Sequence, residues 1–87
     1  MHEAALMKDL MKKILQTAKE QGAKRVVGIK VKLGALSHLT PEHFREHFEE
    51  VSPGTLAAGA RIQAEQSTDI HDPKAQEVIL QSIEVED

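Results

Sequence analysis

The first three residues, Met1, His2 and Glu3, carry the clearest metal-ligand chemistry in the sequence. A free terminal amine, the backbone nitrogen of His2 and the His2 imidazole can all reach one ion, and Glu3 or another donor can complete the coordination plane. Nitrogen and oxygen donors in a square-planar or tetragonal arrangement suit Ni(II) or Cu(II). A histidine and a glutamate before a helix are also common as solvent-exposed residues, so both interpretations stay open at this level.

A second pair of possible ligands is His43 and His47, which are four residues apart in a segment with helical periodicity. Residues at this spacing share a helix face, so the two imidazoles can chelate one ion. No third ligand is evident on the helix, although Glu46 and Glu50 are near in sequence. The alternative, which the sequence favours, is a pair of exposed or half-exposed histidines.

These side chains must be positioned by a predicted helix over residues 4–21 and another over 40–51. The first has an apolar stripe at helical spacing, and its two methionines are predicted to fill the core rather than bind metal. The second begins with Thr40 as the N-cap and Pro41 in the first turn. The stripes consist of Leu6, Leu10, Ile14 and Ala18, with Met7 and Met11 beside them, and of Phe44, Phe48 and Val51.

Three strands are predicted from alternating apolar residues, over 24–33, about 60–66 and about 77–86. In the first strand, Val27, Ile29, Val31 and Leu33 are expected to face the core. The last two strands are expected to pair as an antiparallel hairpin across the polar turn at 67–76. In that turn Asp69, His71 and Asp72 are interpreted as a turn cluster, with a weak metal site as the alternative.

The last strand has apolar residues on both of its predicted faces. Ile79, Ile83 and Val85 are expected to share one face, which leaves Val78 and Leu80 on the opposite one. An outward apolar pair of this kind can cover a strand edge or a homodimer contact. The element order is helix, strand, helix, strand, strand. It predicts an α+β fold with two helices packed on one face of a three-stranded sheet.

Composition limits the possible functions. The chain has 87 residues, a formal charge of −3, no cysteine and only 2% aromatic residues. The acidic balance and the lack of stacking aromatics argue against nucleic-acid binding. No apolar run approaches membrane-spanning length, and early charged residues argue against a signal peptide. We therefore predict a single domain over residues 1–87 that is cytoplasmic and has no membrane partner.

Several segments resemble the HypA/HybF family, whose members are accessory proteins that insert nickel into nickel-iron hydrogenases and in some organisms serve urease. The segments are MHEAALM, GAKRVVGIKVKLGALS, the second predicted helix with its phenylalanines, GTLAAGA and SIEVED. The resemblance extends from Met1 to about Glu65 and resumes at about Val78. In that family the terminal Met-His-Glu is the nickel site, so the resemblance implies that Met1, His2 and Glu3 bind Ni(II).

The sequence departs from the family pattern at positions that affect metal binding. The family normally has a zinc ribbon with two Cys-x-x-Cys pairs between its last two strands, whereas this chain has the turn STDIHDPKAQ and no cysteine. No zinc is therefore expected. The family usually has a glutamate where this chain has Ala35, and often an acidic residue near Thr40. His38 replaces a small residue, and it either substitutes for a lost acidic ligand or is an exposed loop residue.

The resemblance implies a nickel metallochaperone-like protein, not an enzyme, that transfers Ni(II) to maturation partners. The implied partners are a nickel-handling GTPase and the hydrogenase large subunit. This chain has no Gly-rich loop followed by Lys-Ser or Lys-Thr, so any GTP chemistry would belong to the partner. No nucleophile, base and orienting group form a recognisable catalytic set. The alternative is a metal-free protein-interaction adaptor or regulator derived from the same family.

Overall fold

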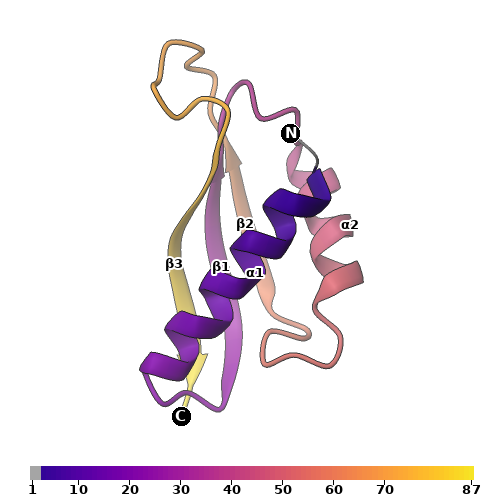
Figure 1. Cartoon of the computed structure of the whole chain (residues 1–87), viewed down its shortest axis with the longest axis vertical. Helices are drawn as coiled ribbons and strands as arrows, with labels where there is room; N and C mark the ends of the chain where they lie inside the picture. The colour runs from indigo at the N-terminus through magenta and orange to yellow at the C-terminus, as the bar shows by residue number, and fades with distance from the viewer. Residues whose placement is uncertain (1–2) are drawn as a thin grey trace.

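A computed structural model describes residues 3–87, and side chains from residue 5 onward. It confirms the predicted α+β fold and the order of its elements (Figure 1). The elements are α1 (Glu3–Glu20), β1 (Arg25–Leu33), α2 (Pro41–Val51), β2 (Arg61–Gln66) and β3 (Val78–Glu86). Neither described helix has the length and apolar composition needed to cross a membrane.

The three strands form one mixed sheet in the order β2-β1-β3, so the predicted hairpin between the last two strands is wrong. β2 runs parallel to β1, because the chain returns to the sheet through α2, and β3 runs antiparallel to β1. The segment 67–77 carries the chain past the end of β1. Its two ends bond to consecutive residues there, through Ser67 N–H to the Leu33 carbonyl at 2.8 Å and Gly34 N–H to the Glu77 carbonyl at 2.9 Å.

An irregularity in β3 reverses the predicted orientation of Val78 and Leu80. Lys30 pairs with Ser82 but Val31 pairs with Leu80, so one residue of β3, Gln81, has no partner. A bulge of this kind shifts the alternation of the strand by one residue. Val78 and Leu80 consequently pack against the core together with Ile83 and Val85. They do not form the outward apolar pair that the sequence pattern suggested.

A similar irregularity in β1 places Val26 in the core instead of Val27. Val26 pairs with Val85 and Gly28 pairs with Glu84, which leaves Val27 as the extra residue. Val26 is fully buried, whereas Val27 is half-buried. The remaining part of the predicted face, from Ile29 to Leu33, points into the core as expected.

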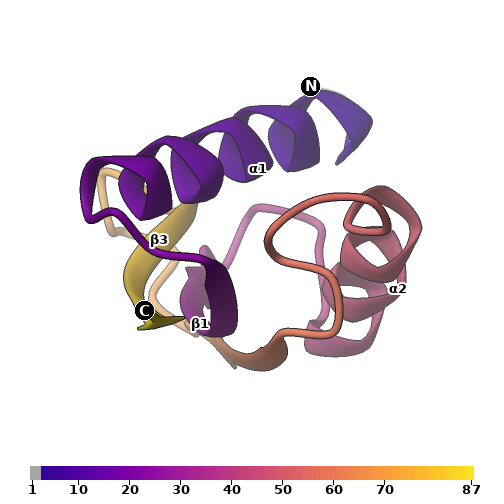
Figure 2. The ribbon, with the colours of Figure 1, turned by 90° about the horizontal axis from the view of Figure 1, so that it is seen from below.

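The two helices enclose the core against one face of the sheet. In Figure 2, α1 crosses one face of the sheet, and α2 lies next to α1. Val51 is an exception to the predicted stripe, because it is the last residue of α2 and is 41% exposed. The buried core includes Met7, Leu10, Met11, Ile14 and Ala18 of α1, Val26, Ile29, Val31 and Leu33 of β1, and Phe44 and Phe48 of α2.

α2 begins at a side-chain cap supplied by Thr40, as predicted. The backbone N–H of His43 donates to Thr40 Oγ1 at 3.1 Å. Replacing Thr40 with alanine is expected to lower the free energy of unfolding by about 1 kcal/mol, measured by urea denaturation. Thr68, which is exposed in the 67–77 segment, is the matched control, and its replacement is expected to change stability by less than about 0.5 kcal/mol. Equal losses in the two variants would contradict the capping role.

Candidate functional site

The predicted terminal ligands lie at the start of α1, which begins at Glu3. Met1 and His2 lie outside the described residues, and so does the side chain of Glu3. What the structure does describe is the surface around this end of α1. The loop that follows β1 reaches the same end of the molecule as the first turn of α1 (Figure 1).

His38 lies in that loop and lines a pocket of about 350 Å³ together with Leu6 of α1. Leu36, Ser37 and Gln76 complete the lining. The His38 side chain is exposed, and its backbone has a φ of 62°. Left-handed backbone is uncommon for residues other than glycine, although histidine is among the residues that adopt it more often. The structure thus brings the candidate ligand His38 to the amino-terminal end of α1.

Ser37 holds the turn that presents His38. Its side chain is buried, and its hydroxyl donates to the Gly34 carbonyl at 2.7 Å. The Ser37 backbone N–H donates to the same carbonyl at 3.0 Å, and the Leu39 N–H approaches Ser37 Oγ at 3.4 Å. This role of Ser37 was not predicted from the sequence. The feature of the sequence that could have indicated a turn stabilised by a serine hydroxyl is the position of Ser37 in a loop that also contains Gly34.

The 67–77 segment supports the turn from the other side. Leu36 N–H donates to the Ala75 carbonyl at 2.7 Å, which continues the β1–β3 pairing beyond the ends of both strands. Gly34 is buried at this contact, and a Cβ atom there would lie 2.1 Å from the Ala75 carbonyl oxygen. Only glycine allows the two backbones to approach this closely.

In the Asp69, His71 and Asp72 cluster, the two aspartate side chains accept hydrogen bonds from nearby backbone N–H groups. Asp69 Oδ1 accepts from the His71 N–H at 3.0 Å, and Asp72 Oδ1 accepts from the Lys74 N–H at 2.9 Å. These are the side-chain-to-backbone bonds that aspartate makes in turns. Across residues 5–87, whose side chains are described, no group of three or more histidine, aspartate or glutamate side chains is arranged to hold a metal ion.

His43 and His47 lie on consecutive turns of α2, as predicted. Their ring centroids are 5.8 Å apart and the ring planes are tilted by 52°. His43 is exposed and His47 is half-buried. The pair therefore offers two imidazoles to one region of the helix surface, without a third protein ligand among the described side chains.

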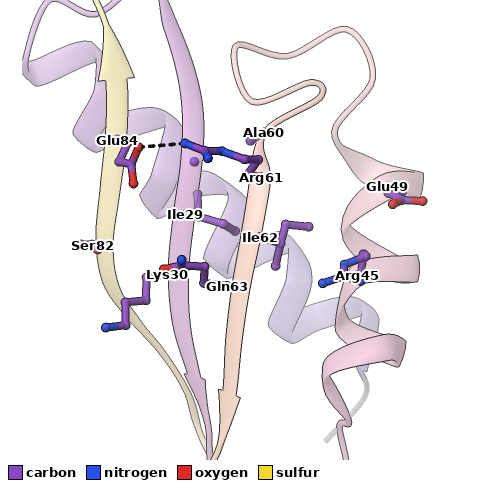
Figure 3. A pocket seen from close by; sticks show the side chains of 11 residues that line it. Ile29, Lys30, Arg45, Glu49, Ala60, Arg61, Ile62, Gln63, Ser82 and Glu84 are labelled. Atoms are coloured by element: carbon purple, nitrogen blue, oxygen red, sulfur yellow. Dashed lines mark hydrogen bonds and ion pairs between the residues drawn. The ribbon is translucent and has the colours of Figure 1, made fainter.

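A hollow of about 370 Å³ lies beside β2, between the sheet and the side chains of Arg45 and Glu49 on α2, and no histidine lines it (Figure 3). Arg61 reaches across β1 to Glu84, with their side chains 3.4 Å apart, and Gly28 is the residue between them in the register. Both charged side chains are mostly exposed, so this ion pair contributes little to stability. The candidate site therefore lies at the amino-terminal end of the molecule rather than in this hollow.

Comparison with known proteins identifies a family. Residues 1–84 match the family model described as "Hydrogenase/urease nickel incorporation, metallochaperone, hypA". Curated relatives called hydrogenase maturation factor HypA include one from Rhizobium leguminosarum bv. viciae, 35% identical over 63 residues, and one from Rhodopseudomonas palustris strain BisB5, 41% identical over 63 residues. Each alignment covers 72% of this chain but 56% of the relative, so the chain spans little more than half the length of these relatives.

A solved structure shows the same fold. The solution structure of the Ni metallochaperone HypA from Helicobacter pylori matches with a TM-score of 0.80 and covers 99% of this chain and 98% of that one. The identity is 17%, so this likeness is evidence for the fold alone. Because the family model spans residues 1–84 and the relatives share more than a third of the aligned positions, the chain belongs to the HypA family of hydrogenase/urease nickel incorporation proteins.

Proposed function

We propose that this chain binds Ni(II) through the Met1 amine, the His2 nitrogens and Glu3, and passes the ion to a hydrogenase maturation partner. The observation that carries the proposal is the family match, which begins at residue 1 and so includes the Met-His-Glu sequence.

His38 is proposed as a further ligand. It lines a pocket with Leu6, which lies one helical turn from the start of α1. An imidazole is a suitable donor for Ni(II). Its exposed position on a left-handed turn would let it join or leave the coordination sphere without disturbing the buried core.

Such a site suits transfer rather than turnover. Metal binding must displace protons from the terminal amine and the imidazole, so the affinity should fall as the pH is lowered. A site at the chain terminus also leaves room for a partner to bring in competing ligands. We propose that the partners are a nickel-handling GTPase and the hydrogenase large subunit. The metal-free adaptor is the less favoured function, because Val78 and Leu80 pack against the core and do not form the outward apolar pair that would have favoured it.

Blocking the terminal amine provides the test of this proposal. A chain with residues added before Met1 should lose at least about tenfold in Ni(II) affinity, because the amine and its chelate ring are removed together. Calorimetry against the chain with a native terminus measures the difference. The same residues added after Asp87 provide the control, since β3 ends at Glu86. Unchanged affinity in the amino-terminally extended chain would exclude the terminal amine as a ligand.

A further inference from the structure

His43 and His47 occupy a defined flank of α2. Phe44 and Phe48 of the same helix are buried in the core, and Arg45 and Glu49, one position further along, line the hollow beside β2. Each residue advances about 100° around a helix. The two histidines, one position before each phenylalanine, therefore lie on the opposite flank. α1 passes on that side of α2 (Figure 2).

The distance between the two ring centroids is close to the distance expected for two imidazoles that bind the same ion. A metal bonded to one nitrogen of each imidazole at about 2.1 Å holds the two ring centres about 5 Å apart at a tetrahedral angle. The observed separation is 5.8 Å, so small rotations of the side chains would bring both rings onto one ion, and the ion would replace the interaction that His47 makes in this structure. The capped and regular helix fixes the two backbones, which reduces the entropy lost when the chelate forms.

The charge around the pair favours a cation. Glu46 and Glu50 are exposed on the adjoining outer surface of α2, whereas Arg45 points to the other flank, toward the hollow. Exposed carboxylates of this kind raise the local concentration of divalent ions without being ligands themselves. No third side chain among residues 5–87 completes the set, so the remaining coordination positions are open to water or to other donors.

We propose that His43 and His47 form a second, weaker site for Ni(II) or a similar late first-row divalent ion. This inference goes beyond the proposed function, because it concerns a ligand set separate from Met1, His2 and Glu3. α2 begins at the same end of the molecule as α1 (Figure 1). A weakly held ion on α2 would therefore be near the terminal site, and the pair would serve as a point of exchange during loading or release.

The test uses Ni(II) titrations of the full chain by calorimetry. His2→Ala removes the terminal site and should leave about one weakly bound ion per chain. Adding His43→Ala and His47→Ala to this variant should lower the remaining affinity at least tenfold. Adding His71→Ala instead is the matched control, because His71 is an exposed histidine in the 67–77 segment whose backbone N–H makes its bond to Asp69. That control should retain the weak site.

Thermal unfolding gives a second readout, because an ion that bridges successive turns binds only the folded helix. Ni(II) should raise the melting temperature of the His2→Ala chain but not that of the triple variant. The proposal is overturned if His2→Ala binds no Ni(II), if the His71 control loses the weak site, or if replacing only His43 and His47 abolishes the tight ion. Failure of the terminal site is a separate result, seen as unchanged tight binding in His2→Ala.

Discussion

Replacing His2 with alanine is expected to lower the Ni(II) affinity of the tight site by about a hundredfold or more. Loss of an outer hydrogen-bonding partner of a metal ligand already costs about 10- to 100-fold, and here a ligand itself is removed. The fold should be retained, because His2 precedes α1 and the buried core begins at Met7. Calorimetry gives the affinity, and circular dichroism checks the helix content.

Two further variants sharpen this prediction. His38→Ala should cause a smaller loss than His2→Ala, because His38 would contribute one donor rather than part of the terminal chelate. His71→Ala should leave the tight site unchanged, since His71 belongs to the turn cluster. Tight binding that persists in His2→Ala would exclude the terminal model, and equal affinity in His38→Ala and the native chain would remove His38 from the ligand set.

Replacing Gly34 with alanine is expected to lower the free energy of unfolding by about 3 kcal/mol. The new Cβ would lie 2.1 Å from the Ala75 carbonyl oxygen, which is a backbone atom and cannot rotate away. The segments must then separate, which weakens the hydrogen bonds from Gly34 to Glu77 and from Leu36 to Ala75. Urea denaturation measures the loss.

Gly28→Ala provides the control, because Gly28 lies within β1 whereas Gly34 directly follows it. A Cβ at Gly28 would lie 3.4 Å from the nearest atom, on the flexible side chain of Glu84. The expected change in unfolding free energy is below about 1 kcal/mol. A Gly34 variant no less stable than the Gly28 variant would show that the close approach between the loop and the 67–77 segment is unimportant for stability.

The helices and the extent of each strand could be predicted from the sequence because they depend on local periodicity. Strand pairing could not be obtained from the length of the 67–77 segment alone. The strand-helix-strand arrangement of β1, α2 and β2 was the better signal, since such units usually place their two strands in parallel. The orientation of Val78 and Leu80 was mispredicted for a different reason, because a single unpaired residue, Gln81, reverses the alternation.

The candidate site was only partly accessible from the sequence. The ligand types of Met1, His2 and Glu3 and the helical spacing of His43 and His47 are visible in the residues themselves. The position of His38 depends on a left-handed turn and on contacts with residues some 40 positions later in the chain, Ala75 and Glu77. Contacts between such distant segments leave no local pattern, so the sequence alone does not distinguish a metal ligand from an exposed loop residue at His38.

Because the 67–77 segment is attached to the sheet at its two ends, a segment of another length can take its place. Ser67 and Glu77 are hydrogen-bonded to consecutive residues at the end of β1, on its two sides. Neighbouring strands are about 4.8 Å apart, so the two attachment points are separated by roughly 10 Å. The entropic cost of closing a loop rises only slowly with its length. A module of very different size can therefore be carried at this position while the sheet, the helices and the amino-terminal surface keep their arrangement.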